Sequence, residues 1–208
     1  MTAGDDMSLQ NRVDPFGELF ASPARGLLMG NRGGRLHDDN RKVGRRRWAS
    51  RQWICCKLQF NNRHRQVWGD SYTELFFLDE VTALAAGHRP CFECRRKDAE
   101  NFAVLFSGKK KRATAPAMDL VLHRERLDGK GKRTHRRKID ELPDGAMLAL
   151  GAEPFAVRGQ RILRWTPSRY SGAQPRPRGI EVDVLTPLSI VAVLEAGFSP
   201  LWHPSAGA

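Results

Sequence analysis

The segment of residues 72–96, YTELFFLDEVTALAAGHRPCFECRR, constrains the fold of this chain more than any other. It combines a buried-strand pattern, a short helix that Asp79 can cap and that Gly87 and Pro90 stop, and the pair Cys91-x-x-Cys94. Two cysteines with this spacing can turn both sulfurs towards one ion in a tight loop. Because a structural zinc usually takes two such pairs, we expect a Zn²⁺ centre here, with the rest of the fold arranged around it. A reduced CxxC without metal and a redox dithiol are the alternatives.

The remaining metal ligands are less fully specified by the sequence. Cys55 and Cys56 are adjacent in the run WICCKLQF, which alternates like a strand, so their side chains point to opposite faces. Only one of them can reach a metal held on one face, and we expect Cys56, with Cys55 as the alternative. His64 and His88 are the candidates for the fourth ligand, and His37 and water are further alternatives.

The order of elements around these cysteines is typical of a treble-clef zinc site. A hairpin over residues 53–68, with Asn61-Asn62 as its turn, is expected before the CxxC pair. A helix from about residue 98 to 107 is expected directly after it. One ligand therefore comes from the hairpin and two come from the start of the helix, where the helix dipole stabilises thiolate charge.

The run from Phe76 to Arg96, with AGHRPCFEC at its centre, resembles the metal-binding domain of the Ada-type DNA methylphosphotriester repair proteins. The resemblance covers about residues 53–107. In that family a strand carrying Phe, a short Ala-rich helix, AGxRPCxxC and a following helix build half of a four-cysteine zinc site. The resemblance implies zinc ligation by the CxxC pair and by one of the adjacent cysteines upstream. The family's first pair is CxxxC and includes the methyl acceptor, and because this chain has only adjacent cysteines there, the acceptor role does not transfer.

The charge of the chain favours partners that are rich in phosphate. Its 35 Lys and Arg outnumber 23 Asp and Glu, which gives a formal net charge of +12. Basic residues gather at residues 32–51, where Trp48 and Trp53 are interleaved, and at residues 109–138. A solvated basic surface with core tryptophans is the alternative. The expected nucleic-acid contacts are Arg41, Lys42, Arg45, Arg46, Arg47, Trp48, Arg51, Lys109, Lys110, Lys111, Arg133, Arg136 and Arg137.

The chain divides into four expected parts, which together form an α+β protein. These are a tail and docking segment at 1–30, an Ada-like zinc-binding domain at 31–108, a basic linker or arm at 109–138, and a small, mostly antiparallel α+β unit at 139–208. No apolar run approaches the roughly 20 residues needed to span a bilayer. The polar start of the chain has no secretory h-region, so we expect a cytoplasmic protein with no membrane partner.

These observations predict a zinc-dependent nucleic-acid-binding protein that is non-catalytic and associated with DNA rather than RNA. The first alternative is a metal-dependent nuclease or DNA-repair enzyme, with His37, Asp38 and Asp39, or His64 with Glu74, as its candidate residues. The second alternative is a structural or partner-binding protein whose zinc only stabilises the fold.

Overall fold

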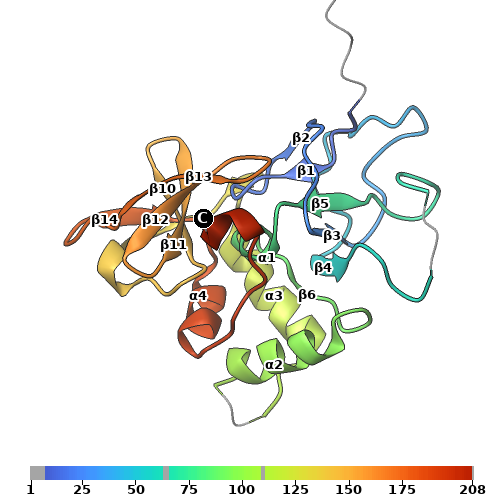
Figure 1. Ribbon diagram of the computed structural model, residues 1–208. Coiled ribbons are helices and arrows are strands. Elements are labelled where there is room, and N and C mark those ends of the chain that lie inside the picture. Colours follow the sequence, from blue (N-terminus) through green and yellow to red (C-terminus); the bar gives the residue numbers. More distant parts are fainter. Residues whose placement is uncertain (1–7, 63–65, 109–110, 208) are drawn as a thin grey trace, which may run out of the picture.

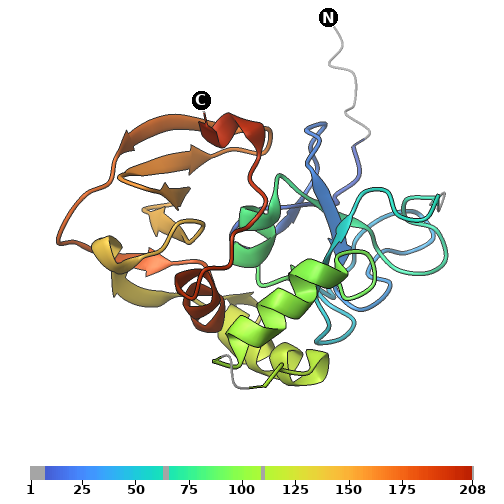
Figure 2. The same ribbon diagram turned by 60° about the horizontal axis from the view of Figure 1, so that its bottom comes forward.

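The computed structural model describes residues 8–62, 66–108 and 111–207. Within these ranges the chain is an α+β fold with two six-stranded sheets, a short hairpin and four α-helices. The sheets lie on either side of the central helix α1, and the other three helices gather at one end of the molecule (Figures 1 and 2). The helices are α1 (Glu80–Ala85), α2 (Arg96–Phe106), α3 (Ala115–Arg126) and α4 (Leu188–Glu195), with 3-10 turns η1 (Ile139–Glu141) and η2 (Pro204–Gly207).

The first sheet has the strand order β2-β1-β5-β3-β4-β6. Its strands are β1 (Arg12–Val13), β2 (Leu19–Phe20), β3 (Leu28–Asn31), β4 (Ile54–Lys57), β5 (Leu75–Phe77) and β6 (Arg89–Pro90). β4 pairs antiparallel with β3, so that Met29 lies opposite Cys56, and parallel with β6. The expected hairpin over 53–68 is therefore replaced by a pairing with the earlier apolar piece of chain. Residues 63–65 of the expected return strand lie outside the described residues.

The second sheet has the order β13-β12-β11-β10-β14-β9, and all its pairings are antiparallel, as the sequence indicates for this part of the chain. Its strands are β9 (His135–Lys138), β10 (Met147–Leu150), β11 (Glu153–Arg158), β12 (Arg161–Trp165), β13 (Tyr170–Pro175) and β14 (Glu181–Val184). Because β9 is an edge strand of this sheet, the C-terminal unit begins before residue 139.

The range expected as a basic linker or arm, 109–138, carries regular structure wherever it is described. It contains α3, a hairpin of β7 (Leu127–Asp128) and β8 (Gly131–Lys132), and β9. Met118 and Leu122, one helical turn apart on α3, are fully buried in the core formed with α2, α4 and the second sheet. This apolar pair makes the segment part of the core in spite of its charge, which corrects the linker interpretation.

Helix α1 is buried along its whole length and touches three separate parts of the core. Leu84 packs with α2, α3 and α4, while Val81 and Ala85 face the second sheet and Ala83 faces the first. The apolar residues of α1 thus contact neighbours on several sides, while its buried polar residues Glu80 and Thr82 pair with Arg95 and Asp79. No described helix is both long and apolar enough to cross a membrane.

The N-terminal end of α1 is held by the last residues of the chain. Asp79 caps the helix by accepting from the Thr82 amide at 2.9 Å, as the sequence predicts, and also accepts from the His203 amide at 3.0 Å. Glu80 accepts from the Leu201 amide at 2.9 Å. The C-terminal segment is therefore fixed across the end of the central helix.

The C-terminal end of α1 is held by basic side chains from the region of α3 and β8. Lys132 Nζ donates to the Ala85 carbonyl, and Arg126 Nη1 donates to the Gly87 carbonyl at 2.9 Å. Gly87 has φ +85°, and a Cβ there would lie 2.7 Å from Arg126 Cδ, so glycine is required both by the backbone and by the close approach of arginine.

A buried ion pair joins β6 to α3. Arg89 Nε and Nη2 each donate to one carboxylate oxygen of Asp119 at 2.8 Å, and both side chains are almost wholly buried.

Asp119→Ala leaves a buried guanidinium unpaired, so we expect the free energy of unfolding to fall by about 3–5 kcal/mol in urea titrations. Asp128→Ala, which removes an exposed carboxylate 3.7 Å from Arg133, is the matched control and should cost less than about 1 kcal/mol. Equal losses in the two variants would contradict this assignment.

Candidate metal centre and basic surface

Three cysteines meet at one end of the first sheet. The sulfurs of Cys56, Cys91 and Cys94 all lie within 4.8 Å of one another, and all three side chains are buried. They are the only such group of possible metal ligands among the residues that the structure describes. In a tetrahedral zinc–thiolate site the sulfurs would be about 3.8 Å apart, given Zn–S bonds of about 2.3 Å. The three-cysteine group is therefore close enough together to hold a metal ion.

The alternation of β4 decides between the two adjacent cysteines. Cys56 points to the cluster, whereas Cys55 points into the core of the first sheet, where it packs with Leu75 and Phe77 and is wholly buried. Arg95 Nη1 lies 3.8 Å from the Cys55 sulfur. Of the two neighbours that the sequence offers as a third ligand, the structure brings Cys56 to the other two cysteines.

Backbone amides stabilise negative charge on the cluster. The Glu93 amide donates to Cys91 Sγ, and the Lys57 amide donates to Cys94 Sγ, both at 3.4 Å. The pKa of Cys91 is lowered, first because the thiols of Cys56 and Cys94 hydrogen-bond to its sulfur. The pKa of Cys56 is raised, because its thiol hydrogen-bonds to the other two sulfurs. One thiolate is thus favoured in the metal-free group, and thiolate is the form that binds metal.

Arg95 connects the cysteine loop to the central helix. Its Nη1 lies 2.7 Å from Glu80 Oε1, and its Nε and Nη2 donate to Asp98 Oδ2 at 3.0 and 2.9 Å. The pair with Glu80 is buried. Because α2 begins at the next residue, this arginine fixes the loop that carries Cys91 and Cys94 against the start of α1.

The two histidines expected as a fourth ligand have different outcomes. His64 lies outside the described residues and stays a prediction. His88, which directly precedes β6, is not part of the ligand group, and its side chain is buried in the core. The His88 ring lies 5.0 Å from the ring of Trp53 and 4.7 Å from that of Phe77, and burial lowers its pKa well below the usual range. His88 is therefore a neutral core residue.

The residues considered for an enzyme are held in a well-bonded loop. His37 Nδ1 and Nε2 lie 2.7 Å from Thr73 Oγ1 and 3.0 Å from the Gly69 carbonyl, and its ring stacks on Trp68. Glu74 accepts from the Trp68 amide at 2.8 Å. Both polar atoms of the imidazole are thus used inside the loop, while the neighbouring carboxylates Asp38 and Asp39 are exposed.

The first basic cluster keeps most of its charge uncompensated. Arg47 lies 3.8 Å from Glu18, but among the described residues no carboxylate comes within ion-pair distance of the exposed side chains of Arg41, Lys42, Arg45, Arg46 and Arg51. Half-buried Trp48 lies among them and contacts Trp53, with ring centroids 6.3 Å apart. Trp53 itself is buried, so one tryptophan anchors the core and the other reaches the surface.

Three arginines of the second basic cluster that were expected to contact nucleic acid, Arg133, Arg136 and Arg137, lie near carboxylates of this chain. Arg136 lies near Glu181 and Asp183, and Arg137 contacts Glu141 and lies 2.6 Å from Glu195. Arg133 donates to the Leu127 carbonyl beside Asp128. Lys111 is exposed, and Lys109 and Lys110 lie outside the described residues. The arginines of β9 thus face carboxylates of this chain, which weakens the expectation that they contact phosphate.

Comparison with protein-family models, with curated proteins and with solved structures gives no match for this chain. The likeness to the Ada-type metal-binding domain therefore stays a prediction from the sequence.

The metal centre is testable by exchanging one cysteine at a time. We expect the purified protein to contain stoichiometric metal, and we expect Cys56→Ser, Cys91→Ser and Cys94→Ser each to lose it, because each removes one of three converging thiolates. Cys55→Ser, an equal change on the opposite face of β4, is the control and should retain the metal. Metal content by mass spectrometry and the thiolate charge-transfer absorption of the Co²⁺-substituted protein measure both outcomes. Loss of metal in the Cys55 variant alone would refute the assignment.

The same Co²⁺ spectrum tests the fourth ligand. His88→Ala should leave the absorption bands in place and lower only the stability of the fold, because the ring is packed in the core. If His64 is the ligand that the sequence suggests, His64→Ala shifts the d–d bands while the three-thiolate charge transfer persists. Unchanged d–d bands in the His64 variant would assign the fourth position to water or another group.

Proposed function

We propose that this protein binds nucleic acid, DNA in preference to RNA, through the exposed basic surface of residues 41–51, and that it does so without catalysing a reaction. The observation that carries this proposal is the uncompensated charge of that segment. When five exposed cations without carboxylate partners bind phosphates, the nucleic acid releases the counterions condensed on those phosphates. Half-buried Trp48 offers its ring beside these cations. A merely solvated surface needs no aromatic side chain at its centre.

The three-cysteine group has a structural part in this proposal. Zinc is the metal proposed, because thiolate ligands in a closed, buried site favour it. The group lies between β4 and the start of α2, which supports a treble-clef-like interpretation of this corner of the fold. A bound ion would fix β4 against the CxxC loop, and β4 follows directly on the basic segment. The metal would thereby hold the basic surface in place from one of its two ends.

The alternatives receive less support from the arrangement of side chains. A nuclease or repair enzyme needs a histidine and carboxylates that converge on an open metal position, whereas His37 is enclosed by Thr73, Gly69 and Trp68. A structural or partner-binding role with a stabilising zinc accounts for the cysteines, but it gives no reason for the unpaired cations of residues 41–51.

Salt dependence tests the proposal. Affinity for a nonspecific DNA duplex, measured by fluorescence anisotropy across a salt series, should fall steeply as salt rises. Arg45→Gln with Arg51→Gln should weaken binding and reduce the slope of log K against log salt by about 2, because two phosphate contacts are lost. The same titration with RNA of matched sequence tests the preference for DNA.

Arg136→Gln with Arg137→Gln is the matched control for that variant. It removes the same charge, but from side chains that face carboxylates, so the affinity and the slope should stay close to those of the unaltered protein. Absence of binding, or binding that does not respond to salt, would favour the structural or partner-binding alternative. Cleavage of the DNA in the presence of a divalent metal would favour the enzyme.

A further inference from the structure

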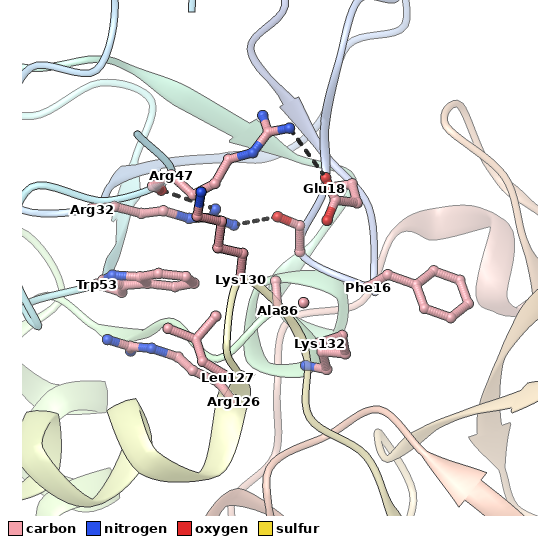
Figure 3. A pocket seen from close by; sticks show the side chains of 12 residues that line it. Phe16, Glu18, Arg32, Arg47, Trp53, Ala86, Arg126, Leu127, Lys130 and Lys132 are labelled. Atoms are coloured by element: carbon pink, nitrogen blue, oxygen red, sulfur yellow. Dashed lines mark hydrogen bonds and ion pairs between the residues drawn. The ribbon is translucent and has the colours of Figure 1, made fainter. Parts of the chain in front are cut away.

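A narrow pocket opens beside the basic surface, between β8, the loop before β2 and the C-terminal end of α1. Figure 3 shows the Arg32 and Arg126 side chains on opposite faces of the Trp53 ring, with Lys130 rising beside Arg32. Both guanidinium carbons lie 3.9 Å from the centre of the indole. Lys132 lines the same pocket. The surface segment and the pocket share Arg47, so the two features are continuous.

Two cations of the pocket, Arg32 and Arg126, are buried without a carboxylate hydrogen-bond partner among the described residues. Arg32 and Arg126 are each 1% exposed. Arg32 donates to the carbonyls of Gly17 at 2.7 Å and Arg47 at 3.3 Å. Arg126 donates to carbonyls and has a buried Nε with no partner among the described residues. The hydrogen-bond acceptors of Arg32 and Arg126 among the described residues are all backbone carbonyls or imidazole nitrogens, which are neutral groups. Buried positive charge with only neutral partners is costly, and an anion would relieve it.

The count of charges around the pocket leaves a clear excess of positive groups. Five basic side chains line it, against one carboxylate, Glu18, which already lies 3.8 Å from Arg47. Asp14 lies close enough to affect the charges of Arg32 and Lys132, and Asp119, which pairs with Arg89, affects that of Arg126. Burial lowers the pKa of Arg32 to about 9 and that of Lys132 to about 7, so both cations are held at a cost.

Capping of α1 explains part of this arrangement but not all of it. Lys132 and Arg126 donate to the last carbonyls of the helix, which is a structural role. Lys130 and Arg47 have no part in that cap, and yet their side chains also line the pocket. The pocket therefore has more basic side chains than are needed to cap the C-terminal end of α1.

We propose that this pocket binds a phosphate monoester group, supplied by the end of a nucleic-acid strand that lies on the basic surface of residues 41–51. This step rests on the proposed function. A terminal phosphate is favoured over an internal one because the pocket is narrow and an internal phosphate needs room for chain on both sides. The exposed side chain of Lys130 lies along the wall and has to move outward when the group enters. A free nucleotide presents the same monoester and is the other possible source.

The experiment compares DNA strands that differ only at one end. Short single-stranded oligonucleotides with a 5′-phosphate, a 3′-phosphate or hydroxyls at both ends are titrated by fluorescence anisotropy. We expect one of the phosphorylated strands to bind at least about tenfold more tightly than the hydroxyl strand, as one or two charge-assisted hydrogen bonds would give. A nucleoside monophosphate is added as competitor in a second series, and it should remove this advantage.

Two charge-matched variants identify the pocket as the source of the effect. Lys130→Gln with Lys132→Gln keeps a donor for the Ala85 carbonyl and should reduce the preference for the phosphorylated end to less than about twofold. Lys97→Gln with Lys138→Gln removes two exposed lysines elsewhere and should keep the preference. Thermal unfolding of all proteins confirms that the variants are folded.

The outcomes separate this inference from the proposed function. Tight, salt-sensitive binding with no preference for a phosphorylated end overturns the pocket assignment and leaves the nucleic-acid surface intact. Loss of the preference in both double variants also overturns it. If no oligonucleotide binds, the proposed function fails, and the pocket is tested by thermal shift with nucleoside monophosphate at constant ionic strength. A shift that the Lys130/Lys132 variant abolishes then supports a free nucleotide as the source, and no shift overturns the monoester site altogether.

Discussion

The fold depends on satisfying both ends of a short helix that is buried on every side. A six-residue helix with no exposed face presents unpaired amides at one end and unpaired carbonyls at the other, and water reaches neither freely. The amide end is closed by carboxylates and by the last residues of the chain. The carbonyl end is closed by Lys132 and Arg126. The hydrogen-bonding requirements of the two ends of α1 thus bring together segments that are more than a hundred residues apart.

This arrangement also accounts for the way charge is distributed over the molecule. Basic side chains are buried at the carbonyl end of α1, where burial lowers the pKa of Lys132 to about 7 and that of Arg126 well below its usual range. Trp53 contacts Arg32 and Arg126 through its two ring faces. The arginines of β9, by contrast, are neutralised by neighbouring strands and by α4. Within the net charge of +12, the five exposed cations of residues 41–51 therefore lack the carboxylate partners that the arginines of β9 have, and this local density of charge matters more for function than the total.

The sequence predicted features that depend on neighbouring residues and missed features that depend on distant ones. The Asp79 cap and the Gly87 stop are encoded within a few residues, and the structure has both. The opposite orientations of Cys55 and Cys56 follow from strand alternation. The partner of β4 was missed because pairing with β3 is a long-range choice between two apolar segments. The linker interpretation of residues 109–138 is wrong because the sequence does not distinguish a buried arginine from a solvated one. Arg126 is buried only through its contacts with Trp53 and with the C-terminal end of α1, which are far away in the sequence.

The adjacent cysteines of β4 have one more consequence. Displacing this strand by a single position along β3 would exchange the two thiols, placing Cys55 beside the CxxC loop and Cys56 in the apolar interior. A cysteine would still lie in the cluster and another in the apolar interior, so packing at these two positions discriminates only weakly between the two alignments of β4. However, flanking residues such as Ile54 and Lys57 would move to the opposite face of the sheet. The sulfur contributed by β4 would also lie at a different position along the strand relative to Cys91 and Cys94. A metal ion bound by Cys56, Cys91 and Cys94 would therefore favour the observed alignment of β4 over the displaced one.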